Sequence, residues 1–125
     1  MSMYILEVSE KQLNIVVKAL DFYSRIQMGQ VSELTNPYAI PLPDADYSDV
    51  ETKVFDLKKT MFPDLDSRSY YSLNSKRLPD TVRQAVDLME TINYEISEPV
   101  EGIQSTKPFH WSNEMDLPKI KKKVD

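Results

Sequence analysis

The stretch SEKQLNIVVKALDFYSRIQMG, from Ser9 to Gly29, carries strong helical signals. Ser9 and Gln12 have the spacing of a capping box, in which two side chains satisfy free backbone N–H groups at a helix start. Apolar residues then recur at helical spacing over a broad surface, which predicts a helix that is packed on more than one side. Gly29 can adopt the left-handed conformation that ends many helices, so we expect a helix over residues 10–28.

A second helix is predicted over residues 49–62. Ser48 and Glu51 repeat the capping-box spacing at its start, and Pro63 ends it. Because of the helical repeat, we expect Lys58 and its neighbouring lysines to lie mostly outside the apolar face. That face consists of Val50, Val54, Leu57 and Met61.

A third helix is predicted over residues 79–97. Pro79 suits the first position of a helix, and Asp80 complements the positive end of the helix dipole. Arg83 and Asp87 have the i,i+4 spacing of a surface ion pair. The apolar face of this helix consists of Val82, Ala85, Val86, Met89, Ile92 and Ile96.

The two ends of the chain differ from these helices. Residues 3–8, with the sequence MYILEV, are β-branched and aromatic, which is typical of a short strand. Residues 99–125 are broken by prolines, yet large apolar residues recur among them, which favours an extended arm docked on the body or on a neighbouring subunit. We therefore expect a mainly α fold in one domain. A helical body of residues 1–98 has a three-helix core and the short N-terminal strand, and the docked C-terminal arm completes it.

The composition excludes several classes of enzyme. The 125 residues include no cysteine, one histidine and two glycines. That leaves no thiol nucleophile, no multi-histidine metal centre and no glycine-rich phosphate loop. No spacing of side chains suggests a catalytic group, so we expect a protein that is not an enzyme and has no cofactor. Acidic residues could in principle bind a metal, but the simpler expectation is helix-start and loop roles for Asp44, Asp46, Asp49, Asp64 and Asp66.

The charge of the chain limits its partners. The net charge is −5, although residues 107–125 carry five basic and three acidic residues. An acidic protein is a poor match for broad nucleic-acid binding or for an anionic membrane surface. The apolar runs are too short to span a bilayer, and the N-terminus lacks the pattern of a signal peptide. We therefore expect a cytoplasmic protein with no membrane partner.

A loop between the second and third predicted helices could bind a small anion. Arg68, Lys76 and Arg77 flank the adjacent rings of Tyr70 and Tyr71. Cations can hold the phosphates of a nucleotide while aromatic rings stack on its base. The alternative is a solvated loop with one structural tyrosine.

Three further residues are candidates for the same ligand. His110 and Trp111 on the arm could donate a hydrogen bond and offer a stacking surface, or Trp111 could simply anchor the arm. Arg25 lies between apolar stripes near the end of the first predicted helix. A partly buried guanidinium there needs a carboxylate or a phosphate.

Three stretches resemble a family of small, mostly uncharacterised proteins encoded by bacteriophages. They are ALDFYSRIQMGQ (Ala19 to Gln30), LPDTVRQAVDLMETINYEI (Leu78 to Ile96) and FHWSNEMDLPKI (Phe109 to Ile120). The resemblance implies a protein made in the cytosol of a bacterial host, of the kind that antagonises host defence. It implies no functional residues.

Two functions fit these expectations. The first is a non-catalytic homo-oligomer that sequesters a small anionic, nucleotide-like signal in a pocket formed with the C-terminal arm. The alternative is an acidic inhibitor or adaptor that binds a host protein through its charged surface and apolar arm.

Overall fold

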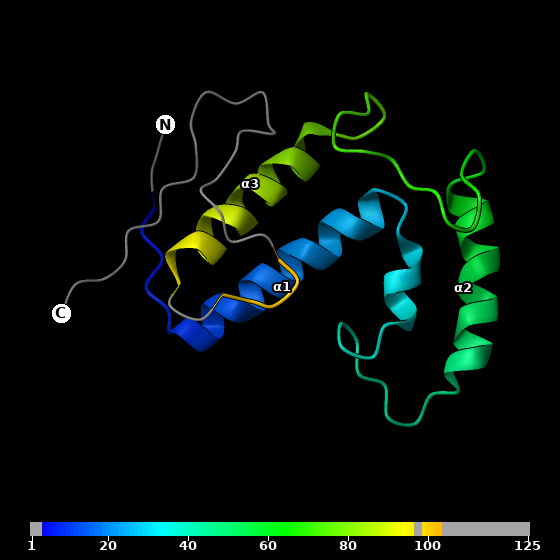
Figure 1. Cartoon of the computed structure of the whole chain (residues 1–125), viewed down its shortest axis with the longest axis horizontal. Helices are drawn as coiled ribbons and strands as arrows, with labels where there is room; N and C mark the ends of the chain where they lie inside the picture. Colours follow the sequence, from blue (N-terminus) through cyan, green and yellow to red (C-terminus); the bar gives the residue numbers. More distant parts are fainter. Residues whose placement is uncertain (1–3, 97–98, 104–125) are drawn as a thin grey trace.

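The computed structural model describes residues 4–96 and 99–103 of the chain (Figure 1). This part is mainly helical and contains no strand. Three α-helices and one short 3₁₀ helix follow one another along the chain, and they are α1 (Glu10–Gln27), η1 (Val31–Thr35), α2 (Tyr47–Met61) and α3 (Asp80–Glu95). The three predicted helices are therefore confirmed to within a few residues at each end.

Helix α1 begins and ends where its sequence predicts. The Ser9 hydroxyl accepts a hydrogen bond from the Gln12 backbone N–H at 3.1 Å, and the Gln12 side chain accepts one from the Ser9 N–H at 2.9 Å. This confirms the capping box. Gly29 follows the last turn with φ +91°, a conformation that residues with a Cβ rarely adopt.

Helices α1 and α3 form the centre of the molecule. They run side by side in opposite directions in Figure 1. Val17 of α1 packs among apolar side chains of α3, and half-buried leucines and valines surround this cluster. The buried members of the cluster are Val17, Val86, Met89, Ile92 and Ile96. Burial of each such side chain contributes about 1.5–3 kcal/mol, so this pair of helices supplies most of the hydrophobic stabilisation.

Helix α2 stands apart from that pair, which corrects the prediction of a three-helix core. It packs against η1 and makes no close backbone contact with α1 or α3 (Figure 1). Its buried side chains are Val54 and, one turn later, Lys58. Leu57 and Met61 remain largely exposed. The contact surface of α2 is therefore small and includes a lysine that the sequence pattern placed outside it.

The starts of α2 and α3 differ in detail from the predictions. Asp46, rather than Ser48, caps α2, and its carboxylate accepts hydrogen bonds from the backbone N–H groups of Ser48 and Asp49. Pro79 is the cap of α3 rather than its first helical residue. Both differences shift a helix start by only one or two residues.

A cationic side chain holds the loop between α2 and α3. The Arg83 guanidinium donates hydrogen bonds to the carbonyl oxygens of Leu73, at 2.8 Å, and of Ser75 and Leu78. The sequence predicted an i,i+4 pair of Arg83 with Asp87, whereas the guanidinium faces the loop. A loop without regular structure needs such donors for its carbonyl groups.

The predicted ends of the chain are tested only in part. Residues 4–8 form no strand within the described ranges, and the side chains of Tyr4 and Ile5 are exposed. A strand needs a partner for its backbone groups, and these residues have none there. Most of the predicted C-terminal arm lies outside the described residues. Within 4–96 and 99–103, no helix is long and apolar enough to cross a bilayer.

We predict that Gly29→Ala destabilises the fold more than Gly102→Ala. Both glycines have positive φ, which costs a residue with a Cβ about 1–2 kcal/mol. A Cβ at Gly29 would also collide with the Leu65 side chain, whereas one at Gly102 would meet open space. Urea unfolding of the two variants measures the difference. Equal losses would mean that Leu65 moves aside at no cost.

Candidate functional site

A pocket of about 390 Å³ lies between α2, η1 and the loop at residues 67–70. Helix α2 contributes Val54, Phe55 and Lys58, and the loop contributes Arg68 and Tyr70. The volume is in the range of small-molecule sites. Two of the predicted ligand residues, Arg68 for the phosphate and Tyr70 for stacking, therefore line a pocket together.

Lys58 gives the pocket a buried positive charge. The residue is only 7% exposed, and its ammonium group donates one hydrogen bond, to the Ser69 carbonyl oxygen at 2.7 Å. Within the described residues no carboxylate lies at ion-pair distance from it. A lysine ammonium has three N–H donors, so two remain for a bound molecule.

The loop beside Lys58 is held by a tight turn. The Asp66 carboxylate accepts hydrogen bonds from the backbone N–H groups of Arg68 at 2.9 Å and Ser69 at 2.8 Å. The Asp66 N–H in turn donates to the Ser69 hydroxyl at 2.8 Å. The Arg68 and Ser69 hydrogen bonds favour the ionised carboxylate and lower the pKa of Asp66 below its ordinary value of 3.8.

Arg68 extends from this turn to the edge of the pocket. Its side chain is exposed, and its guanidinium makes no hydrogen bond or ion pair with the described residues. The turn fixes the backbone of Arg68 at the edge of the pocket, where its exposed side chain can reach a bound anion. Lys58 and Arg68 together make this side of the pocket suitable for an anion.

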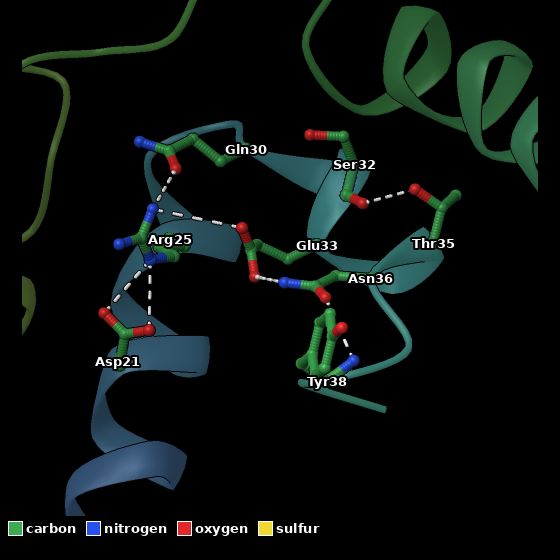
Figure 2. A network of polar contacts seen from close by, with 8 residues as sticks. All are labelled: Asp21, Arg25, Gln30, Ser32, Glu33, Thr35, Asn36 and Tyr38. Carbon is green, nitrogen blue, oxygen red and sulfur yellow. Dashed lines mark hydrogen bonds and ion pairs between the residues drawn. The ribbon is translucent and has the colours of Figure 1, made fainter. Parts of the chain in front are cut away.

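The rest of the wall combines aromatic and polar groups. Phe55 and Tyr70 are 40% and 55% exposed as residues and line the pocket, so their rings can serve for stacking. Ser32 and Thr35 of η1 also line the pocket. Figure 2 shows these two residues near each other, with the Thr35 hydroxyl donating to the Ser32 carbonyl oxygen at 2.7 Å. The carboxylate of Glu51 completes the α2 side.

Tyr71 and Arg77 do not join Tyr70 in the pocket. The Tyr71 hydroxyl donates to Asp64 at 2.7 Å and accepts from the Arg77 guanidinium at 2.9 Å. Arg77 also forms an ion pair with Asp64, and the Phe62 ring meets the Tyr71 ring edge-on at 6.1 Å. The charge of Arg77 is already balanced by Asp64, so this cluster is not an open anion site. Its contacts instead join the end of α2 to the loop.

Arg25 also forms its polar contacts with other side chains of the protein (Figure 2). Its guanidinium lies 3.0 Å from the Asp21 carboxylate and 3.9 Å from that of Glu33, and it donates to the Gln30 side chain at 3.0 Å. The sequence predicted that Arg25 needs a carboxylate or a phosphate, and carboxylates meet that need. The network orders the turn between α1 and η1.

The start of the predicted arm lines a second, open cavity of about 880 Å³ beside α1. Residues 99–103 form one side, and Arg25 lies on another. Two cations, Lys18 and Arg25, line this cavity with three carboxylates, those of Asp21, Glu33 and Glu101, and Arg25 is paired with the first two of them. This cavity is therefore less suited to an anion than the pocket beside α2.

Of the remaining predicted ligand residues, only Lys76 lies in the described part of the chain, and it lines neither cavity. Lys76 is exposed in a turn of the loop and contacts no described polar side chain. His110 and Trp111 lie outside the described residues. Among the described members of the predicted site, Arg68 and Tyr70 line the pocket, whereas Arg25, Tyr71, Lys76 and Arg77 do not.

Four of the five acidic residues weighed as metal ligands have other roles. Asp46 caps α2, and Asp49 forms an ion pair with Lys53 at 2.9 Å. Asp64 and Asp66 hold the loop as described above. Across residues 4–96 and 99–103, no three acidic or histidine side chains gather as a metal site requires.

We predict that Asp66→Asn makes the thermal stability less sensitive to acid. Because the folded pKa of Asp66 lies below 3.8, the ionised carboxylate stabilises the fold above that pH. The stabilisation is lost as the pH falls through the folded pKa. The variant should therefore have a lower melting temperature than the wild type at pH 6, and the difference between the two melting temperatures should shrink in acid.

Thermal melts followed by circular dichroism from pH 6 to pH 3 test this. Asp44→Asn is the matched control because Asp44 is exposed and has no hydrogen bond to a described residue. Its melting curve should follow that of the wild type. A gap between Asp66→Asn and the wild type that stays constant across the pH range would contradict the charge-based explanation.

Comparisons with known proteins find no similar protein. No family model, curated protein or solved structure matches the chain. The resemblance to bacteriophage proteins therefore remains a prediction, and the proposal below depends on the pocket alone.

Proposed function

We propose that the protein binds a small anionic, nucleotide-like molecule in the pocket between α2, η1 and the loop at residues 67–70. The observation that carries the proposal is Lys58, whose buried ammonium donates one hydrogen bond, to a neutral carbonyl, and has no other acceptor among the described residues. The role is binding and sequestration without catalysis.

The energetics of burial support this assignment. Removing an ammonium group from water costs several kcal/mol unless an opposite charge or further hydrogen bonds compensate for it. Asp66 is close enough for its pKa to respond to the charge of Lys58, but the two do not form an ion pair. A phosphate between Lys58 and Arg68, whose guanidinium has no partner in the described part of the chain, would supply further compensation.

The aromatic wall suggests the second half of the ligand. Phe55 and Tyr70 line the same pocket as the two cations and keep large parts of their rings exposed. A base could stack on one or both rings while its phosphate meets the cations. In the bacteriophage setting that the resemblance implies, such binding would withdraw a nucleotide signal from host defence. A homo-oligomer remains a prediction.

We predict that Lys58→Met weakens binding of a 5′-mononucleotide about ten- to a hundredfold. Hydrogen bonds to charged groups contribute about 1.5–3 kcal/mol, and methionine keeps the apolar stem of the side chain. Isothermal titration calorimetry with AMP, GMP and ribose 5-phosphate measures the loss. Arg68→Ala should weaken binding several-fold as an independent variant.

The matched control is Lys59→Met. Lys59 neighbours Lys58 on α2 but is exposed and does not line the pocket, so its loss should leave binding within about twofold. Absence of heat and of a thermal shift for all three probes with the wild type would overturn the proposal. Equal losses for Lys58→Met and Lys59→Met would show that only overall charge matters.

A further inference from the structure

Glu51 places a negative charge on the wall of a pocket that has two cations. It lines the pocket together with Phe55 and Lys58, all from α2. It is exposed and forms no hydrogen bond or ion pair with the residues that the structure describes. A free carboxylate repels a second anion nearby, so the part of the ligand that faces Glu51 must donate hydrogen bonds.

The spacing along α2 separates the two kinds of charge. Glu51 and Lys58 are seven residues apart, which is about two helical turns and about 10.5 Å along the axis. That spacing puts both on nearly the same side of the helix, with Phe55 one turn from Glu51. The order along this wall is carboxylate, aromatic ring and ammonium. A 5′-mononucleotide has the same order, with its base edge, its base face and its phosphate.

The chemistry of the base edges distinguishes the purines. Guanine presents two adjacent donors on its Watson–Crick edge, the N1–H and the exocyclic amino group, which fit the two oxygens of a carboxylate. Adenine presents one donor beside an acceptor, N1, which a carboxylate repels. Charge-assisted bidentate pairs are the strongest and most specific of such contacts.

We infer that the pocket takes a guanine nucleotide, with its 5′-phosphate at Lys58 and Arg68 and its Watson–Crick edge on Glu51. The inference rests on the proposed function and adds the identity of the base. Glu51 is then the residue that determines specificity, while Lys58 and Arg68 provide affinity for any nucleotide.

Isothermal titration calorimetry of the full chain with GMP, IMP and AMP tests the inference. IMP keeps the N1–H but lacks the exocyclic amino group, so binding should weaken from GMP to IMP to AMP. We expect GMP to bind at least about tenfold more tightly than AMP, as one good bidentate contact allows.

Glu51→Gln tests whether Glu51 causes that order. Glutamine offers one donor and one acceptor, which fit the adenine edge and leave guanine at most a neutral pair in place of a charge-assisted one. The affinity for GMP should therefore fall about tenfold and the affinity for AMP should rise. Asp56→Asn is the matched control because it removes one negative charge from an exposed position of α2 outside the pocket. It should leave the order of the three nucleotides unchanged.

The outcomes separate the inference from the proposed function. If the wild type binds all three nucleotides within twofold, or if Glu51→Ala keeps the preference for GMP, the inference about Glu51 is wrong and the anion pocket stands. If neither the nucleotides nor ribose 5-phosphate bind, the proposed function itself fails. Melting curves confirm that each variant is folded, and Glu51→Ala, which should lose the preference without gaining AMP, provides a second variant.

Discussion

Two cationic side chains hold the loop between α2 and α3, and the placement of α2 depends on that loop. Lys58 of α2 donates a hydrogen bond to the Ser69 carbonyl oxygen, and Arg83 of α3 donates hydrogen bonds to the carbonyl oxygens of Leu73 and Ser75. The loop has no regular structure to satisfy its carbonyl groups, so the cations take the place of a backbone ladder. Because α2 packs on η1 and not on α1 or α3, these bonds help to fix where it lies.

The cations of the protein differ in how their charges are balanced. Arg25 and Arg77 each face a carboxylate, from Asp21 and Asp64 respectively. Lys58 is more buried than either, yet its one hydrogen bond to a described residue goes to a neutral oxygen. A buried charge without an ion-pair partner lowers the stability of the free protein, and an anion that binds there offsets this cost. This contrast favours Lys58 as the centre of a ligand site.

The parts of the fold that depend on neighbouring residues could be predicted from the sequence. The capping box at Ser9 and the stop at Gly29 are local signals, and both are confirmed. A strand depends on a distant partner, and residues 4–8 have none in the described structure. The burial of Lys58 was missed because periodicity treats lysine as polar, although its long apolar stem can be buried. Its i,i+4 spacing from Val54 was the available signal.

The candidate site shows why nearness in sequence is a weak guide to nearness in space. Tyr70 and Tyr71 are adjacent in the chain, yet one lines the pocket and the other bonds Asp64. The pocket instead combines η1, α2 and the loop, three elements that share few contacts with the α1–α3 pair. A ligand that bridges Lys58 and Arg68 would add contacts where the fold has few of its own. Binding would therefore stabilise the α2 region more than the already well-packed centre, since local stability follows the density of contacts.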